Sequence, residues 1–283
     1  MKIKKIETYT NQYVGFVKVI TDDNHFGWGQ MSTYNADITA QIFHRQVSPW
    51  SLGLNLSEEK PDFSDHLQLI LEREHKYPGS YLLRALSGLD TALWDLYGRY
   101  KELPVASLIG GSPMKIRAYG SSMRRDIEPE NESKRLCKLR DDYGFTAFKF
   151  RVGSECGRDL DEWEGRSRDI VSKLSIGLGD NIDKLVDGNS CFSPQKAIEL
   201  GKFMEDHGIC HFEEPCPYWE HDQTKKVKEA LKLDVAGGEQ DCDIATWKST
   251  LEKRIVNIAH PDIMYMGGLY RTLNLAEMIN NSG

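Results

Sequence analysis

The sequence lacks the features that mark several large classes of protein. Its 283 residues carry a net charge of −7, so no basic excess favours nucleic acid or an anionic membrane as a partner. No apolar run approaches the roughly 20 residues that span a bilayer. No apolar segment follows the basic start at residues 1–5, so a signal peptide is not expected. These absences favour a globular protein of the cytoplasm.

Common metal-binding and nucleotide-binding motifs are also missing. The six cysteines form no CxxC pair, and Cys210, His211 and Cys216 have no second pair that would complete a zinc site. The eight histidines include no HExxH motif. No glycine pair precedes Lys-Ser or Lys-Thr, and no helix is expected directly after Gly27-Trp28-Gly29, so neither phosphate-binding pattern is present. The cysteines are expected to be reduced, as in cytoplasmic proteins.

The pattern of secondary structure changes near residue 112, and the length suits two domains. Before this point, strands are expected at 3–10, 14–21 and 26–29 and helices at 37–46, 63–74 and 80–100. After it, helices alternate with strands expected at 116–119, 147–151, 184–187, 211–214, 235–239 and 255–259, and a helix follows at 269–279. Regular alternation predicts an α/β fold with a parallel sheet or barrel, divided into domains 1–112 and 113–283. Six strands are visible, whereas a closed barrel needs eight.

Three of the predicted strands end on acidic residues at equal spacing. Asp187, Glu213 and Glu239 lie 26 positions apart, and one strand with its crossover helix takes about 25–30 residues. Acids at the carboxyl ends of successive parallel strands would meet at the catalytic face of a barrel. Converging carboxylates repel one another unless a cation lies between them, and oxygen ligands favour Mg²⁺. The alternative is that each acid caps the helix that follows it.

Other polar residues lie at the same predicted strand ends. Lys149 and Arg151 are two positions apart on one strand and therefore share a face. Two cations beside a metal suit an anionic substrate such as a carboxylic acid, although a surface ion pair is the alternative. Asn189 shares the face of Asp187 and is a candidate for substrate contact. Asp262 ends the next strand, where a turn or helix cap is the alternative.

These motifs, in this order, resemble the enolase superfamily, and specifically its mandelate racemase/muconate lactonizing branch. The resemblance rests on the stretches ALSGLDTALWD (85–95), PV (104–105), LIGG (108–111), FKFR (148–151), VDGN (186–189), FEEP (212–215), GGEQ (237–240), PD (261–262) and GG (267–268). It covers almost the whole chain.

The resemblance implies an N-terminal α+β capping domain and a modified (β/α)7β barrel. It places Asp187, Glu213 and Glu239 on the three ligand positions of one Mg²⁺ ion. The shared reaction step is removal of the proton α to a carboxylate, with the resulting enediolate stabilised by the metal. It further implies a cytoplasmic enzyme that acts on a small carboxylate and forms a homo-oligomer, either a dimer or an octamer.

Two positions bear on the subgroup. Asp262 stands where lactonizing and epimerising members have a lysine base, and it resembles the aspartate that orients a histidine in racemases and acid-sugar dehydratases. Arg151 stands at the second lysine of the family's Lys-x-Lys motif. Arginine holds its proton at neutral pH and is a poor base, which argues against a two-base racemase. In a dehydratase Arg151 would clamp a carboxylate or a distal hydroxyl.

The sequence therefore predicts a Mg²⁺-dependent dehydratase of aldonates or aldarates, a carbon–oxygen lyase. The first alternative is a racemase or epimerase of an α-hydroxy acid. The second is an inactive, C-terminally truncated chain, because the histidine partner of Asp262 is expected near position 289 and only about six βα units are visible.

Overall fold

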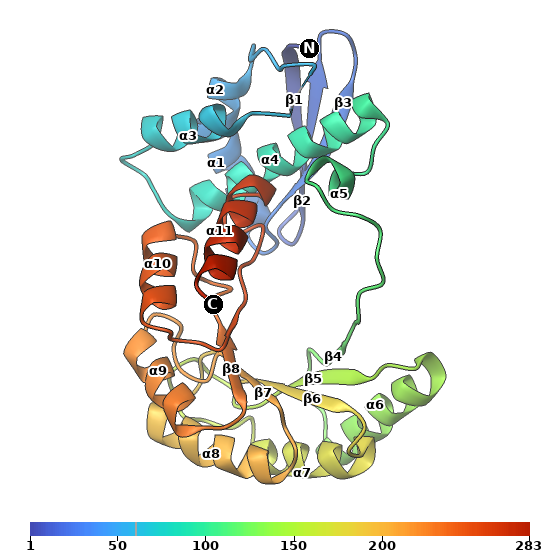
Figure 1. Cartoon of the computed structure of the whole chain (residues 1–283), viewed down its shortest axis with the longest axis vertical. Helices are drawn as coiled ribbons and strands as arrows, with labels where there is room; N and C mark the ends of the chain where they lie inside the picture. Colours follow the sequence, from blue (N-terminus) through green and yellow to red (C-terminus); the bar gives the residue numbers. More distant parts are fainter. Residues whose placement is uncertain (60) are drawn as a thin grey trace. The chain divides into compact units, whose positions relative to one another are not determined.

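A computed structural model describes residues 1–59 and 61–283, which form two compact units. The first unit comprises residues 1–114, 239–247 and 261–283, and the second comprises 115–238 and 248–260. The sequence-based division at residue 112 had assigned both later segments of the first unit to the second domain. The chain can be followed by colour through both units in Figure 1.

The first unit contains an antiparallel sheet and helices. Its strands are β1 (Ile3–Thr10), β2 (Gly15–Thr21) and β3 (Phe26–Met31), which pair in the order β1-β2-β3. Its helices are α1 (Ala36–Ile42), the π-helix η1 (Phe43–Val47), α2 (Ser48–Ser51), α3 (Ser64–Arg73), α4 (Ser80–Lys101), α5 (Val105–Leu108) and α11 (Leu269–Asn281); α10 (Ile244–Glu252) begins in this unit and ends in the second. The helix expected at 37–46 is thus divided into α1 and η1.

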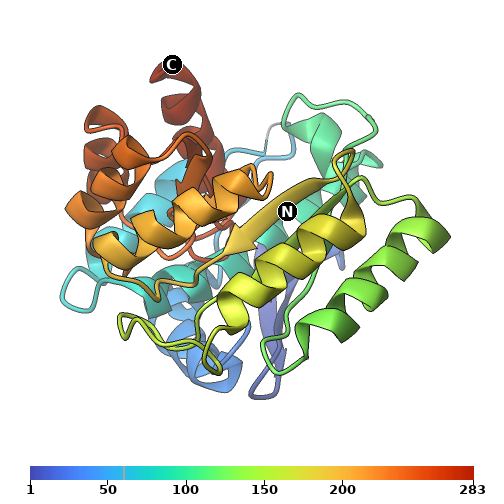
Figure 2. The ribbon, with the colours of Figure 1, turned by 90° about the horizontal axis from the view of Figure 1, so that it is seen from below.

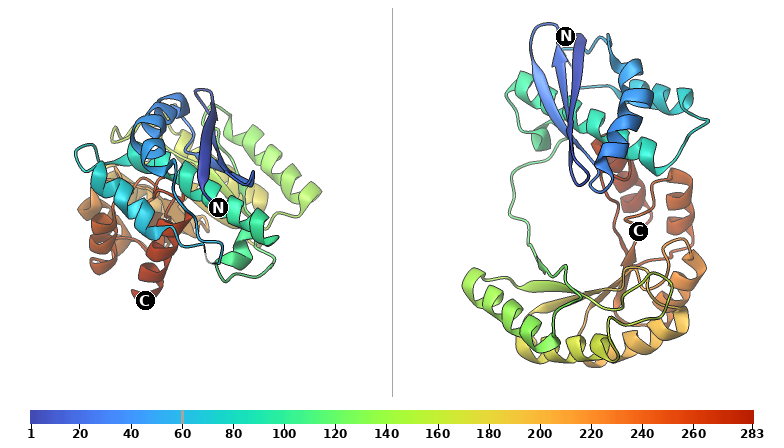
Figure 3. Two further views of the ribbon diagram at one scale, coloured as in Figure 1. Left: turned by 90° about the horizontal axis from the view of Figure 1, so that it is seen from above. Right: turned by 180° about the vertical axis from the view of Figure 1, so that it is seen from behind.

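Helix α4 packs directly on the three-stranded sheet. In the right panel of Figure 3, α4 is the teal helix behind the blue strands. Its buried leucines, including Leu82, Leu86, Leu89 and Leu93, recur at helical spacing and face the core with strand residues of β1 and β2. Gly27 and Gly29 of β3 permit this approach, because a Cβ at either position would collide with the α4 backbone. The GxG sequence therefore serves helix packing.

The second unit is built on a six-stranded parallel sheet. Its strands are β4 (Gly120–Ser121), β5 (Ala147–Arg151), β6 (Asp183–Asp187), β7 (His211–Glu213), β8 (Asp234–Gly237) and β9 (Ile258–Ala259), which pair in sequence order. Its helices are α6 (Pro129–Tyr143), α7 (Arg166–Leu178), α8 (Pro194–Asp206) and α9 (His221–Ala230). Figure 2 shows α6, α7 and α8 side by side over one face of the sheet. The predicted α/β fold with a parallel sheet is confirmed.

The core of the second unit lies between these helices and the strands. Phe148, Phe150, Val186 and Phe212 belong to the strands, and they pack with apolar residues of α6, α7 and α8 such as Leu174. The strand residues that pack against these helices are apolar. The polar side chains that do occur at the strand ends are therefore notable.

Three predicted strands differ most from the observed ones. The strand expected at 116–119 is absent and β4 lies at 120–121, because Ile116 and Tyr119 are exposed and Gly120 instead pairs with Phe148. The strand expected at 235–239 ends at Gly237, where Gly238 takes a φ of +106° that turns the chain. The strand expected at 255–259 is limited to β9.

Two further expectations concern the chain as a whole. Within residues 1–59 and 61–283, no helix has the length and apolar character that crossing a membrane would require. All six cysteines are free thiols.

Candidate active site

Two buried acids lie next to each other where β6 and β7 end. Asp187 and Glu213 are the last residues of these strands and are directly paired in the parallel register. Arg151, the last residue of β5, is paired with Asp187 on its other side. Asp187 is 2% exposed and Glu213 is 3% exposed, so their charges require partners. Because the strands end at the same level, residues of neighbouring strands can supply these partners.

Lys149 bridges the two acids. Its Nζ lies 2.5 Å from Glu213 Oε2 and 3.4 Å from Asp187 Oδ2. Burial alone would lower the pKa of Lys149, but the charges of Asp187 and Glu213 outweigh burial and raise it. Lys149 is therefore a buried cation in this arrangement. Lys149 and Arg151 share one face of β5, as their spacing predicts, since both point to Asp187.

Two histidines complete the surroundings of Glu213. His260 Nδ1 lies 3.4 Å from Glu213 Oε1, and His211 Nε2 lies 3.9 Å from Glu213 Oε2. The imidazole rings stack with their centroids 5.4 Å apart. Burial would raise the pKa of Glu213, but interactions with His211, His260 and Lys149 together hold this pKa well below its usual range. Glu213 is ionised.

Neither histidine is predicted beside Glu213 from the sequence, where His211 is considered only with Cys210 and Cys216 as an incomplete zinc site and His260 is taken as structural. A signal existed for His211, which lies two positions before Glu213 on the same strand and therefore shares its face. No local signal placed His260 there, since it follows a different strand. His211, Glu213 and His260 form the one group of metal-ligand side chains detected in the described chain, and their ligand atoms lie within 4.8 Å of one another.

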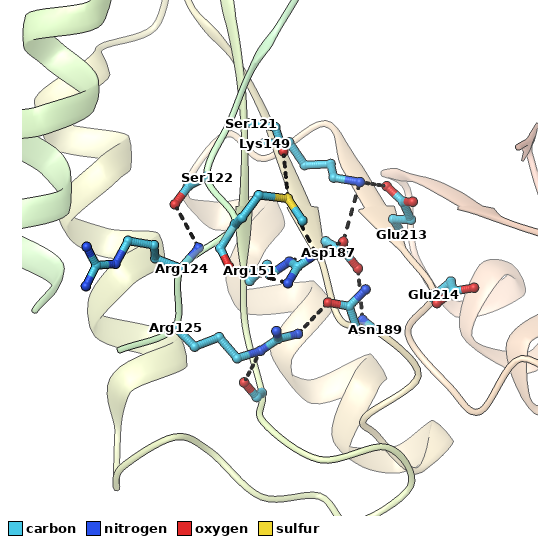
Figure 4. A network of polar contacts seen from close by, with 12 residues as sticks. Ser121, Ser122, Arg124, Arg125, Lys149, Arg151, Asp187, Asn189, Glu213 and Glu214 are labelled. Carbon is cyan, nitrogen blue, oxygen red and sulfur yellow. Dashed lines mark hydrogen bonds and ion pairs between the residues drawn. The ribbon is translucent and has the colours of Figure 1, made fainter. Parts of the chain in front are cut away.

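Figure 4 shows a polar network that continues from Asp187 towards the loop after β4. The backbone N–H of Asn189 donates to Asp187 Oδ1 at 2.9 Å. The side-chain oxygen of Asn189 accepts a hydrogen bond from Arg125 Nη2 at 2.5 Å. Asn189 adopts a φ of +42°, an uncommon conformation that tends to occur at functional sites. Arg125 was not singled out in the sequence.

The two remaining predicted site residues belong to the first unit. Glu239 follows β8 by two positions, and its Oε1 accepts a hydrogen bond from Gln240 Nε2 at 3.1 Å. Asp262 Oδ1 accepts hydrogen bonds from the backbone N–H groups of Met264, at 2.7 Å, and Tyr265, at 2.9 Å. These bonds are those of a turn residue, which is the alternative role of Asp262 given above.

The donor set in the second unit fits a hard divalent cation. Asp187 and Glu213 are neighbouring carboxylates, and in the structure the ammonium of Lys149 lies between them. A site that holds one positive charge between two acids has the electrostatics that a cation requires, and carboxylate oxygens are the ligands that Mg²⁺ prefers.

Comparison with known families identifies the chain. Residues 3–110 match the mandelate racemase/muconate lactonizing enzyme N-terminal domain, and residues 132–283 match the enolase C-terminal domain-like family. The chain belongs to the enolase superfamily and, within it, to the mandelate racemase/muconate lactonizing enzyme family. This confirms the resemblance predicted from the sequence.

Relatives of the chain are named as enzymes of acid sugars or of an acid-sugar lactone. Three proteins are each 26% identical to it: arabinonate dehydratase of Saccharolobus solfataricus, D-galactarolactone cycloisomerase of Agrobacterium fabrum and D-xylonate dehydratase of Haloferax volcanii. The matches cover 94%, 94% and 93% of this chain and 69%, 68% and 65% of those proteins, respectively. Two of the three are hydro-lyases, in agreement with the predicted dehydratase-like enzyme.

Solved structures share the fold closely. A protein of Roseobacter denitrificans is 55% identical, with a TM-score of 0.96 over 100% of this chain and 76% of its own. A mandelate racemase/muconate lactonizing protein of Paracoccus denitrificans, complexed with magnesium, is 25% identical, with a TM-score of 0.91 over 100% of this chain and 76% of its own. Magnesium binding thus occurs within the family.

Proposed function

We propose that this protein is a Mg²⁺-dependent acid-sugar dehydratase. The proton α to the substrate carboxylate is removed, the hydroxyl group on the adjacent carbon leaves as water, and the product is a 2-keto-3-deoxy acid. The reaction is redox-neutral, since the elements of water leave and the resulting enol becomes a ketone. The observation that carries the proposal is the pairing of Asp187 and Glu213 with Lys149 at the ends of parallel strands.

In this proposal Asp187, Glu213 and Glu239 hold the Mg²⁺ ion, which when bound stabilises negative charge that develops on the substrate carboxylate. Lys149 supplies a second positive charge beside the same carboxylate. The raised pKa of Lys149 suits a residue that stays protonated and orients an anion. Arg151 remains a cation and contacts the substrate, and Asn189 contributes a hydrogen-bonding amide.

Proton transfer requires a base besides these cations. We propose that Asp262 orients a histidine from a following strand of a modified (β/α)7β barrel, to which the six observed strands would belong. Cytoplasmic location and assembly as a homo-oligomer, dimer or octamer, stay predictions of the same kind.

The test is incubation with arabinonate, xylonate and galactarate in the presence of Mg²⁺. Keto-acid formation and exchange of the α proton in D₂O are measured together. We expect keto acid from at least one of these acids, and loss of this activity in Glu239→Gln but not in Glu252→Gln, a change of an exposed acid in α10. Exchange without elimination would indicate a racemase or epimerase. If folded protein that binds Mg²⁺ gives neither keto acid nor proton exchange, the dehydratase proposal is contradicted.

A further inference from the structure

Arg125 is a half-buried cation whose side-chain hydrogen bonds go to neutral groups. It lies in the loop after β4, where its Nε donates to the backbone carbonyl of Gly153 at 3.0 Å and its Nη2 donates to Asn189 Oδ1 at 2.5 Å. Both acceptors are neutral. Among the described residues, no carboxylate oxygen lies within ion-pair distance of this guanidinium. Burial of a charge is unfavourable unless it is paired, so a ligand that supplies the missing anion would be stabilised here.

Arg151 is poorly satisfied in the same place. Within residues 1–59 and 61–283 its buried Nε has no hydrogen-bond partner, and its ion pair with Asp187 Oδ2 is long, at 3.9 Å. Its Nη1 reaches the backbone carbonyl of Met123 only at 3.4 Å. Asp187 also faces Lys149, so its one negative charge is shared between two cations. Burial and the charge of Arg151 lower the pKa of Arg125, and the charges of Asp187 and Glu162 oppose this shift without cancelling it.

The neighbouring residue shows how an ordinary arginine of this loop is paired. Arg124 is 55% exposed at its side chain and forms an ion pair with Asp126 at 2.8 Å. In Figure 4 its side chain points away from the network, whereas that of Arg125 points towards Asn189. The same loop therefore contains Arg124, which is paired with an acid at the surface, and Arg125, which donates hydrogen bonds to neutral groups of the site.

The order of groups along the site separates two ends. In Figure 4, Lys149 and Glu213 lie at one end, Asp187 and Arg151 follow, and Asn189 and Arg125 lie at the other end. Glu213 at the first end and Asp187 in the middle are two of the acids that we propose as metal ligands. The second end contains the guanidinium of Arg125 and the amide of Asn189, which match an anionic or hydroxylated part of a substrate remote from the reacting carbons.

We propose that Arg125, together with Arg151 and Asn189, forms a subsite for the second carboxylate of a dicarboxylic sugar acid, so that the enzyme prefers aldarates to aldonates. This inference rests on the proposed dehydratase function for its substrate class. A guanidinium binds a carboxylate through two parallel hydrogen bonds, and a terminal hydroxymethyl group offers neither the charge nor this geometry.

The test compares galactarate with D-galactonate, which have the same configuration at their hydroxyl-bearing carbons and differ at carbon 6, a carboxylate in one and a hydroxymethyl group in the other. Binding in the presence of Mg²⁺ is measured by calorimetry, and keto-acid formation is measured separately. We expect the wild-type protein to bind galactarate at least about 10-fold more tightly. Arg125→Met should weaken galactarate binding roughly 10- to 100-fold and galactonate binding less than about 3-fold.

Two variants control for indirect effects. Arg124→Met removes a cation from the same loop and should change neither affinity, and Arg125→Lys should retain part of the preference because it keeps the charge and loses the planar fork. Equal weakening of both acids in Arg125→Met, or equal effects of Arg124→Met and Arg125→Met, would overturn the subsite. So would a wild-type protein that binds neither acid or binds both equally.

The two proposals can fail separately. If the wild-type protein prefers galactarate and Arg125→Met loses this preference, but no keto acid forms, the subsite is supported and the dehydratase proposal is refuted. Keto acid formed equally well from both acids would support the dehydratase and refute the subsite.

Discussion

Each compact unit contains a buried acid, and the two acids respond to burial in opposite ways. Asp90 of α4 in the first unit is 0% exposed, and Glu213 of β7 in the second unit is 3% exposed. Burial raises the pKa of Asp90 to about 7, whereas the pKa of Glu213 is held well below its usual range. Burial by itself therefore does not determine whether a carboxyl group is charged; its partners do.

The partners of the two acids differ in kind. Asp90 accepts hydrogen bonds from the backbone N–H groups of Leu269 and Tyr270, the first residues of α11, and within the described residues it has no ion pair. Glu213 has Lys149 and two histidines around it. The first acid completes the start of a helix, and the second is one member of a charged cluster. Such clusters in which partners strongly shift a pKa are typical of functional sites.

The largest effect is expected from removing the charge of Glu213. Glu213→Gln should lower kcat/KM for the best acid sugar at least about 1000-fold, because loss of groups that merely support metal ligands already costs roughly 10- to 100-fold. Mg²⁺ affinity, measured by calorimetry, should fall in parallel. Asp90→Asn is the matched control and should leave Mg²⁺ affinity unchanged. Undiminished Mg²⁺ binding in Glu213→Gln would remove Glu213 from the metal site.

The second effect concerns Lys149. Lys149→Met leaves Asp187 and Glu213 side by side without their cation, and loss of one buried partner costs about 3–5 kcal/mol of the free energy of unfolding. Mg²⁺ should restore most of this loss if the acids share a metal ion. Urea unfolding with and without Mg²⁺ measures both quantities. Lys138→Met, which breaks the exposed pair with Asp142, should cost less than about 1 kcal/mol.

If Mg²⁺ fails to restore the stability of Lys149→Met, the two acids do not hold a metal together. Lys149 would then be an ion-pair partner with a structural role.

The smallest effect is a pH dependence that Asp90 imposes on the first unit. Its pKa is about 7 in the folded protein, whereas the ordinary value for an aspartate in the unfolded chain is 3.8, so the folded state binds more protons between these values. Stability from this group is therefore present at low pH and falls as pH rises towards 7. Between pH 5 and 8 the wild-type protein should lose about 3 kcal/mol relative to Asp90→Asn.

Thermal and urea unfolding of both proteins over this pH range measures that difference. Parallel curves for wild type and Asp90→Asn would show that Asp90 does not titrate in this range, and the contrast with Glu213 would lose its basis.

Much of the second unit could be predicted from local patterns. The alternation of strands and helices depends on periodicity within short segments, and most strands were placed within a few residues. Lys149 and Arg151 share a face because a strand alternates with a period of two. The strand at 116–119 was misplaced because its apolar residues are exposed, and burial is not a local property.

The register between strands lay beyond such patterns. Asp187 is level with Glu213, as equal spacing implied, but Ala236 and not Glu239 is level with Glu213 on the next strand. Equal spacing along the chain does not give equal height in a sheet. Level positions are 26 residues apart between β6 and β7 but 23 residues apart between β7 and β8, so Glu239 lies three positions beyond the level of Glu213.

The sequence by itself determined the fold class, the family and the types of residue available at the strand ends. The tertiary structure alone decided which of them meet: His260 beside Glu213, Arg125 against Asn189, and Asp90 at the start of α11. These pairs join segments 47, 64 and 179 positions apart in the chain. No periodicity within one helix or strand reaches so far, and the pairings follow from the packing of whole elements.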